Sequence, residues 1–345
     1  MDNDFIELAH GDGGRSMDNF IEKFILTKFQ KTNTPQGIGL KALDDGAAIK
    51  LSDGRFMVTS IDAHVINPIF FPGGDIGRLA VAGTVNDVAV MGAIPLAITD
   101  ALIIEEGFPM GDLEKIVSSM NTMALEAAVS LIGGDTKVMP RGELDQIAII
   151  TSGLGISFTN KLILDSGANP GDKIICTGTI AEHELTILVT REKINVQSEI
   201  QSDITPLNHL MNQIYEKTGS IPITAAKDIT RGGLAAITNE IASKSNVSLW
   251  INESEIPIQD SVFHLCEMLG VDPLNMANEG KILLTCHPEK AEEVLNVISN
   301  LEEGKNARII GECRQTPTKS VILETKVGGK RILRRPVARS LPRIC

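Results

Sequence analysis

Apolar residues recur along the chain at two different spacings. Continuous apolar runs predict buried strands over residues 55–61, 96–104, 147–156 and 173–177. Apolar residues three or four positions apart predict helices over residues 17–25 and 113–124. Further helices are expected at residues 207–217, 233–243 and 291–298, and further strands at 281–286, 308–310 and 321–323. This mixture predicts an α/β or α+β fold.

A predicted helix over residues 75–91 is apolar almost all round, yet it contains Asn86 and Asp87. Asp75 suits the N-cap of this helix, and Gly92 suits its C-terminal stop. A carboxylate inside an apolar helix is rarely left buried without a partner. Asp87 therefore either makes a local cap or bridge, or it faces a functional site.

A stretch rich in Gly, Asn, Pro and Asp around residues 159–172 predicts a linker between two halves. The length of 345 residues also favours two domains. We expect an N-terminal domain over residues 1–160 and a C-terminal α/β domain over residues 161–333. Residues 334–345 are expected to form a mobile tail.

Composition narrows the classes of function. The formal net charge of −12 and the 3% aromatic content argue against nucleic acid as a partner. No apolar run approaches the length of a membrane span, and the first ten residues lack the pattern of a signal peptide, so we expect a cytoplasmic protein. The five cysteines are widely scattered and show no zinc-binding spacing, which favours reduced thiols.

The end of the sequence is basic and finishes on a thiol. Residues 326–345 contain seven Lys or Arg and no Asp or Glu, and the last four residues read Pro-Arg-Ile-Cys. Fully extended, residues 334–345 span about 40 Å. A basic arm on an acidic chain is expected to dock into its own protein and carry Cys345 into a cleft. The alternative is an expendable terminal cysteine.

Several acidic residues stand beside glycines or at the ends of predicted elements: Asp45, Asp62, Asp87, Asp135 and Asp228. Each alone is more often a turn or cap residue. With the glycines of residues 11–14 and with Lys137, they suggest a polyphosphate held through Mg²⁺, because hard cations prefer carboxylate oxygens. The sequence has no P-loop and no protein-kinase motif, so the nucleotide site belongs to another class. Glu279 precedes a predicted strand, in a loop setting typical of functional groups.

Eight stretches along the whole chain resemble one family. They read AHGDGGR, DDGAAI, SIDAHVINPIFFPGGDIGRLAVAGTVNDVAVMGAIP, IIEEG, GGDTKV, DITRGG, ANEGK and PRIC. In these stretches the chain is similar to the HypE family of hydrogenase maturation proteins, the carbamoyl dehydratases. That family lies within the wider aminoimidazole ribonucleotide synthetase (PurM-like) superfamily. The DGAA and GGDT stretches are shared by the superfamily, whereas residues 64–74 and PRIC are specific to this branch.

The resemblance implies a two-domain PurM-like fold and a homodimer whose first domains join their sheets into a shared barrel. It implies that ATP and Mg²⁺ bind in the cleft between the domains, near Asp45, Asp62, Asp87 and Asp228. It also implies that residues 133–137 line the path between nucleotide and tail: Gly133, Gly134, Asp135, Thr136 and Lys137.

The resemblance further implies the reaction. The carbamoyltransferase HypF would load a carbamoyl group onto Cys345, and ATP would drive its dehydration to a thiocyanate. The cyanide would then pass to iron on the HypC–HypD complex. Lys137 suits the phosphate charge, and Glu279 suits removal of a proton. The charges of Arg343 and Mg²⁺ favour the thiolate of Cys345, whereas the α-carboxylate of the same residue opposes it.

One stretch departs from the family pattern. Residues 181–184 read Ala-Glu-His-Glu, where the family usually has Gly-Asp-His-Gly. The replacements put a site role for Glu182 in doubt. His183 remains, and a loop histidine without chemistry is about as plausible there as proton transfer or substrate positioning.

Two alternatives stay open. The first is another ATP-using enzyme of the superfamily, such as a selenophosphate synthetase or a thiamine-phosphate kinase. A selenophosphate synthetase is expected to carry its reactive residue near the N-terminus, whereas the first cysteine here is Cys176. The second is a nucleotide-binding carrier without activity that presents Cys345 to partners. The full set of aspartates and Lys137 argues against it.

Overall fold

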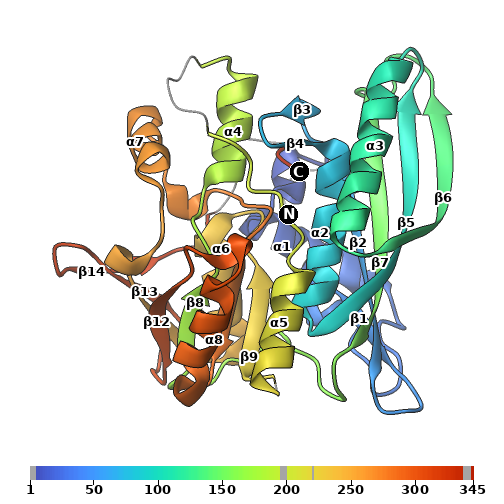
Figure 1. The fold of residues 1–345 in the computed structure, drawn as a ribbon. Coiled ribbons are helices and arrows are strands. Elements are labelled where there is room, and N and C mark those ends of the chain that lie inside the picture. The colour runs from blue at the N-terminus through green and yellow to red at the C-terminus, as the bar shows by residue number, and fades with distance from the viewer. Residues whose placement is uncertain (1–4, 195–199, 220, 337–342) are drawn as a thin grey trace.

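Two separate sheets organise the structure, one in each half of the chain (Figure 1). The computed structural model describes residues 5–194, 200–219, 221–336 and 343–345. Each sheet mixes parallel and antiparallel strands, and helices cover it. The predicted two-domain fold with mixed α/β sheets is confirmed.

The first sheet has five strands. Their order is β1 (Ala47–Lys50), β2 (Phe56–His64), β7 (Ile147–Ser157), β5 (Ala93–Glu105) and β6 (Ser130–Met139). Only the β5–β6 pair is parallel. Helices α2 (Ile76–Val90) and α3 (Met110–Glu126) lie on one face of this sheet, as Figure 1 shows. A short hairpin of β3 (Phe70–Phe71) and β4 (Gly74–Asp75) leads into α2.

Helix α2 lies between the two halves, which explains its continuous apolar sequence. Its side chains pack on the first sheet and on α3, and Ala89 and Val90 join the core beneath α5 of the second half. Asp75 caps the helix as predicted, because its Oδ1 accepts hydrogen bonds from the backbone nitrogens of Gly77 and Arg78 at 2.7 and 3.0 Å. Gly92 follows the helix with a φ of +74°, also as predicted.

The second sheet has seven strands. Their order is β14 (Lys330–Leu333), β13 (Val321–Glu324), β10 (Ser248–Asn252), β12 (Arg308–Arg314), β8 (Lys173–Cys176), β11 (Ile282–Cys286) and β9 (Ile223–Asp228). Helix α6 (Gly233–Ser245) packs into one core of this half, and helices α5 (Asn208–Thr218) and α8 (Ala291–Ser299) pack into another. Helices α4 (Glu182–Arg191) and α7 (Asp260–Leu269) pack together in a further cluster.

Short helices complete the described chain. Helix α1 (Arg15–Phe20) continues directly into η2 (Ile21–Ile25) and η3 (Leu26–Lys28), which confirms a helix over residues 17–25. The other single turns are η1 (Leu8–Gly11), η4 (Leu40–Ala42), η5 (Glu253–Glu255), η6 (Pro273–Asn275), η7 (Pro288–Lys290) and η8 (Glu302–Gly304).

Two predicted elements differ from those observed. Strand β2 continues to His64, so Asp62 lies inside the strand and not at its end. Strand β6 runs without a break through residues 130–139, where the glycine pair had predicted a ligand loop. Gly134 lies so close to Asp100 of β5 that a Cβ there would be 2.1 Å from Oδ1. Gly134 therefore permits close approach of the neighbouring strand, whereas a Cβ at Gly133 would make only an ordinary contact.

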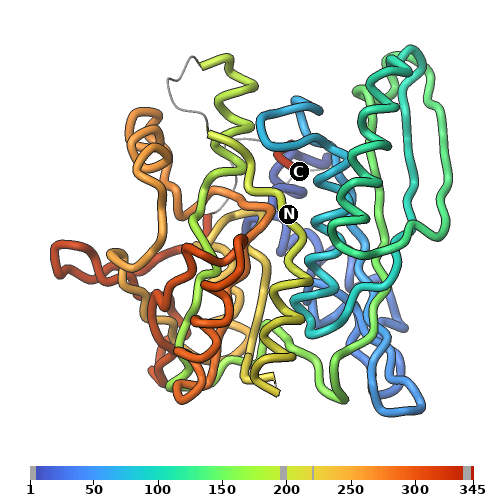
Figure 2. The backbone as a smooth tube through the Cα atoms, viewed as in Figure 1, coloured from blue at the N-terminus to red at the C-terminus, as the bar shows by residue number. Residues whose placement is uncertain are grey.

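The predicted mobile tail falls partly outside the described residues, which omit 337–342. Its start and its last three residues are described. Residues 343–345 lie between the two halves, close to the N-terminal segment (Figure 2). The tail therefore returns to the body of its own chain.

Candidate active site

A cavity of about 690 Å³ opens between the two halves. It is lined by the predicted acidic residues together with the thiol-bearing residue: Asp45, Asp62, Asp87, Asp228, Glu279 and Cys345. These residues come from β2, α2, β9, two loops and the tail, so only the folded chain brings them together.

Three of these carboxylates form one tight group. Oxygen atoms of Asp45, Asp87 and Asp228 all lie within 4.8 Å of one another. The Oγ of Ser60 donates a hydrogen bond to Asp87 at 2.5 Å, which fixes one of the three. Asp62 lines the same cavity but does not belong to this group.

The electrostatics of this group favour a bound cation. Burial, and then repulsion from Asp62 and Asp228, raise the pKa of the Asp87 carboxyl well above its usual value. Burial and Asp45 do the same to the pKa of Asp228. Clustered carboxylates repel one another unless a cation lies between them, and oxygen donors suit Mg²⁺. The donor set present therefore fits the predicted metal.

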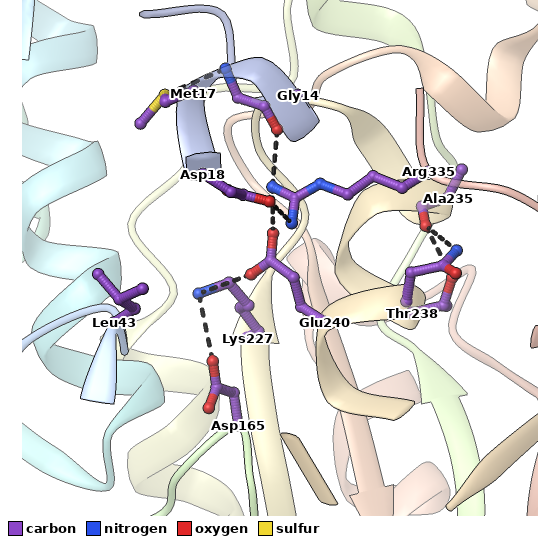
Figure 3. A network of polar contacts seen from close by, with 12 residues as sticks. Gly14, Met17, Asp18, Leu43, Asp165, Lys227, Ala235, Thr238, Glu240 and Arg335 are labelled. Atoms are coloured by element: carbon purple, nitrogen blue, oxygen red, sulfur yellow. Dashed lines mark hydrogen bonds and ion pairs between the residues drawn. The ribbon is translucent and has the colours of Figure 1, made fainter. Parts of the chain in front are cut away.

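Lys227 partly balances the acidic group. It lies 9% exposed on β9 and forms ion pairs with Asp45, with Asp165 at 3.8 Å and with Glu240 at 3.7 Å (Figure 3). Burial acts to lower its pKa, but these carboxylates together raise the pKa of Lys227 well above the usual value. Lys227 is therefore held as a cation against the cavity wall.

The same network fixes the start of the tail. Arg335 forms ion pairs with Asp18 of α1 at 2.6 Å and with Glu240 of α6 at 2.8 Å (Figure 3). Its Nη2 also donates to the backbone oxygen of Gly13 at 2.8 Å. Glu240 contacts both Lys227 and Arg335, so the tail begins beside the carboxylate group.

Glu279 lies buried on another side of the cavity. Its backbone nitrogen donates to Oδ1 of Asp203 at 3.0 Å, and Nδ2 of Asn86 reaches its backbone oxygen at 3.5 Å. Burial and the charges of Asp228 and Asp62 raise the pKa of Glu279 well above its usual value. A carboxylate in such surroundings is a strengthened proton acceptor.

The last three residues of the tail are held by the backbone that follows β2. The backbone nitrogen of Val65 donates to the oxygen of Cys345 at 3.1 Å, and that of Asn67 donates to the oxygen of Arg343 at 3.2 Å. Ile344 is 2% exposed and belongs to the core of the first half. The burial of Ile344 therefore fixes the position of the residue that precedes Cys345.

His183 and Arg191 of α4 hold the same three residues from the other half. Nε2 of His183 lies 2.6 Å from the oxygen of Ile344, and Nδ1 lies 2.7 Å from Oγ of Ser202. Because a carbonyl only accepts, Nε2 carries the proton. Nη2 of Arg191 donates to the oxygen of Arg343 at 2.5 Å. These contacts join His183 to the tail.

The residues beside His183 in the sequence have surroundings that differ from those of His183. Ala181 has a φ of +81°, a conformation that favours glycine. Oε2 of Glu184 accepts a hydrogen bond from the backbone nitrogen of Ala277 at 2.7 Å, two residues before Glu279. Glu182 is bonded instead to Gln259 at 3.1 Å and does not line the cavity.

Arg343 contacts the body of the protein with its side chain. Its Nε donates to the backbone oxygen of Val65 at 2.7 Å, and its guanidinium pairs with Asp145.

The predicted nucleotide residues of β6 lie elsewhere. Residues 133–137 are exposed on the edge strand and do not line the cavity of their own chain: Gly133, Gly134, Asp135, Thr136 and Lys137. Lys137 is 68% exposed and pairs with Asp135 at 3.1 Å. One chain alone does not bring them to the carboxylates.

Sequence reasoning assigned no role to several cavity residues, among them His64, Lys227, Arg231 and Arg335. Two of them had a local signal. His64 lies two positions after Asp62 on a strand, and so shares its face. Arg231 lies within the family stretch DITRGG. The partners of Lys227 and Arg335 are remote in sequence, and no local pattern indicates them.

The fold and the site define the class of protein. Residues 43–157 match the family described as AIR synthase related protein, N-terminal domain, and residues 169–324 match its C-terminal domain. A solved thiamine monophosphate kinase from Aquifex aeolicus shares the fold, with 17% identity and a TM-score of 0.60.

Similarity to individual proteins narrows the class. A putative hydrogenase expression/formation protein of Methanocaldococcus jannaschii is 48% identical over 340 residues, which is 99% of each chain. The carbamoyl dehydratase HypE of Cupriavidus necator is 41% identical over 99% of this chain and 95% of its own. The chain therefore belongs to the HypE family.

Solved structures agree. A structure of a HypE–HypF complex matches with a TM-score of 0.85 and 40% identity, over 92% of this chain and 99% of that one. A structure of HypE in complex with ATP matches with a TM-score of 0.81 and 38% identity, over 99% and 100%. Among the described residues, no helix is long and apolar enough to cross a membrane.

Proposed function

We propose that this protein is an ATP-dependent carbamoyl dehydratase of hydrogenase maturation. Its substrate is a carbamoyl group carried on the sulfur of Cys345, and its product is a thiocyanate on the same sulfur. The observation that carries the proposal is the position of Cys345, which lines one cavity with three clustered carboxylates and Glu279. The relatives named carbamoyl dehydratase and the HypE structure with ATP support it.

The reaction needs activation of a poor leaving group. The carbamoyl oxygen attacks the terminal phosphate of ATP and releases ADP while the nitrogen gives up one proton. Loss of phosphate and of the second proton then leaves the nitrile. Phosphoryl transfer depends mainly on positioning and charge stabilisation. The packing of Ile344 in the core of the first half and the contact of His183 with its backbone oxygen supply positioning, because they fix the backbone next to Cys345.

Glu279 is the proposed proton acceptor for the nitrogen. It lines the cavity with Cys345, and its backbone is held by Asp203 and Asn86. Its raised pKa makes the Glu279 carboxylate a stronger base than an ordinary glutamate.

Asp45, Asp87 and Asp228 are the proposed ligands of Mg²⁺, and Asp62 is a further candidate beside them. A bound Mg²⁺ would offset the negative charge of the phosphates and of the carboxylates. Lys227 holds Asp45 in place through their ion pair.

In the predicted homodimer, Lys137 would act at the cavity of the other copy. Lys137 does not reach the cavity of its own chain, whereas Ile61 is 73% exposed on the free face of the first sheet and also lines the cavity. The cavity therefore borders the face through which we propose that two chains join. Exposed Leu131, Ile132 and Val138 on β6 suit such a contact. Residues 133–137 of one copy would then act at the site of the other.

The remaining assignments are also proposals. HypF is the proposed source of the carbamoyl group, supported by the HypE–HypF complex, and HypC–HypD is the proposed cyanide acceptor. The domain bounds at residues 160 and 333 are supported by the positions of the sheets, since β7 ends at Ser157 and β8 begins at Lys173. A cytoplasmic location is compatible with the five cysteines, all within the described residues, forming no disulfide.

Phosphate release tests the function against the alternatives. The protein, with and without carbamoylation by HypF and carbamoyl phosphate, is mixed with Mg²⁺ and ATP. Release that depends on the carbamoyl group and is lost in Cys345→Ala supports the dehydratase. Equal release without the group favours another ATP-using enzyme, and no release in either case favours a carrier.

A further inference from the structure

His64 is a buried polar side chain in the cavity that the mechanism above does not use. It is the last residue of β2 and is 3% exposed. Neither ring nitrogen has a hydrogen-bond partner in the described parts of the chain. Buried polar atoms without partners are rare and unfavourable, so this ring calls for an explanation.

The ring lines the cavity that also holds the reacting group. His64 and Cys345 line the same cavity, and the next residue, Val65, binds the backbone oxygen of Cys345 at 3.1 Å. The nearest acidic oxygen, Oδ2 of Asp62, is 3.9 Å from Nε2, which is too far for a hydrogen bond. The ring therefore shares the cavity with the end of the tail, and its two nitrogens are without partners in the parts of the chain that the structure describes.

Helix α2 leaves room for this arrangement. Gly83 faces the ring, and a Cβ at that position would lie 3.3 Å from Cε1 of His64 and 3.4 Å from Oδ2 of Asp62. The contact with Cε1 would be tighter than most, so a larger residue would require the ring to shift by a few tenths of an ångström. The glycine thus lets α2 pack closely behind His64 and Asp62.

The ring suits a carbamoyl group, because both of its nitrogens can still form hydrogen bonds. A neutral imidazole has one N–H donor and one nitrogen acceptor. A carbamoyl group has N–H donors and a carbonyl acceptor, so the two groups are complementary.

We propose that His64 hydrogen-bonds the carbamoyl group on Cys345 and orients it for dehydration. This assignment rests on the proposed function. The hydrogen bond to His64 prevents the carbamoyl group from rotating about its bond to sulfur. Its oxygen and its nitrogen then keep separate directions, one toward the phosphate donor and the other toward Glu279.

The test compares His64→Phe with His64→Asn and His64→Gln. Phenylalanine keeps an aromatic ring but cannot form the bond, whereas the two amides can replace one nitrogen each. Full-length protein carbamoylated by HypF is mixed with Mg²⁺ and ATP, and water loss from Cys345 is followed by mass spectrometry. His264→Phe, at a side chain 75% exposed, is the matched control.

We expect His64→Phe to accept the carbamoyl group normally and to dehydrate it about 10- to 100-fold more slowly. At least one amide variant should recover most of the rate. The melting temperature of His64→Phe should equal or exceed that of the wild type, because an unpartnered polar ring is replaced by an apolar one. A merely structural histidine would give a lower melting temperature.

Two results would overturn the inference: unchanged dehydration in His64→Phe, or slow dehydration that neither amide improves. Failure of the wild-type protein to lose water would instead count against the proposed function.

Discussion

Truncation of Ile344 should release the tail. Ile344 is 2% exposed in the core of the first half, and Ile344→Ala removes three buried carbon groups from the docked state alone. At about 0.8 kcal/mol for each group, docking should weaken by about 2.4 kcal/mol. That change corresponds to about a 60-fold smaller docking constant. The backbone contacts of His183 and Arg191 remain, so some docking should persist.

Alkylation of Cys345 measures this release. The other four cysteines are buried, so a thiol reagent should modify Cys345 first, at a rate set by the undocked fraction. The rate should rise toward about 60-fold in Ile344→Ala, up to the limit of a free peptide thiol. Ile332→Ala is the control, because Ile332 is 52% exposed on β14. Equal rates in Ile344→Ala and wild type would refute the view that Ile344 holds the tail.

Other expected results concern stability and positioning. Without metal, stability should fall as the pH rises from about 4 to about 7, because burial and neighbouring acids raise carboxyl pKa values, to about 7 for the cavity residue Asp44, so the folded state binds more protons over this range. Thermal melting that shows no such fall, or no relief by Mg²⁺, would contradict this. In denaturant titrations Arg335→Met should cost about 1–2 kcal/mol, since two acids lose their cation, while Lys330→Met at an exposed pair should cost under about 0.5 kcal/mol. Equal losses of stability in the two variants would contradict the view that Arg335 anchors the start of the tail. Glu184→Ala should slow dehydration and cost about 1–3 kcal/mol, because the backbone nitrogen of Ala277 loses its acceptor; Glu184→Gln should stay near wild type in both assays.

Local signals in the sequence predicted much of the fold. The cap at Asp75 and the stop at Gly92 act within one turn of α2, so the sequence alone reveals them. Asp87 was informative because a carboxylate conflicts with an apolar helix, and the structure shows that it faces the cavity. The helices α4 and α7 were not predicted. Helix α4 mixes polar residues with its apolar ones, and its buried His183 and Glu184 are explained only by partners in the tail and the loop of Ala277.

Long-range contacts limited the prediction of the site. The ion pairs that join Lys227, Glu240 and Arg335 link three elements, and no spacing in the sequence reports them. The glycine pair at residues 133–134 suggested a ligand loop, because glycine is typical both of ligand loops and of places where two strands approach closely. In β6 it permits close approach of Asp100, which only the paired strand reveals.

The most direct test of the account is the mass of the peptide that contains Cys345. The protein is incubated with HypF and carbamoyl phosphate, and Mg²⁺ and ATP are added afterwards. The account predicts that Cys345 gains a carbamoyl group in the first step and loses water only after ATP is added. A Cys345 that is never modified, or an adduct that keeps its water with ATP present, would contradict it.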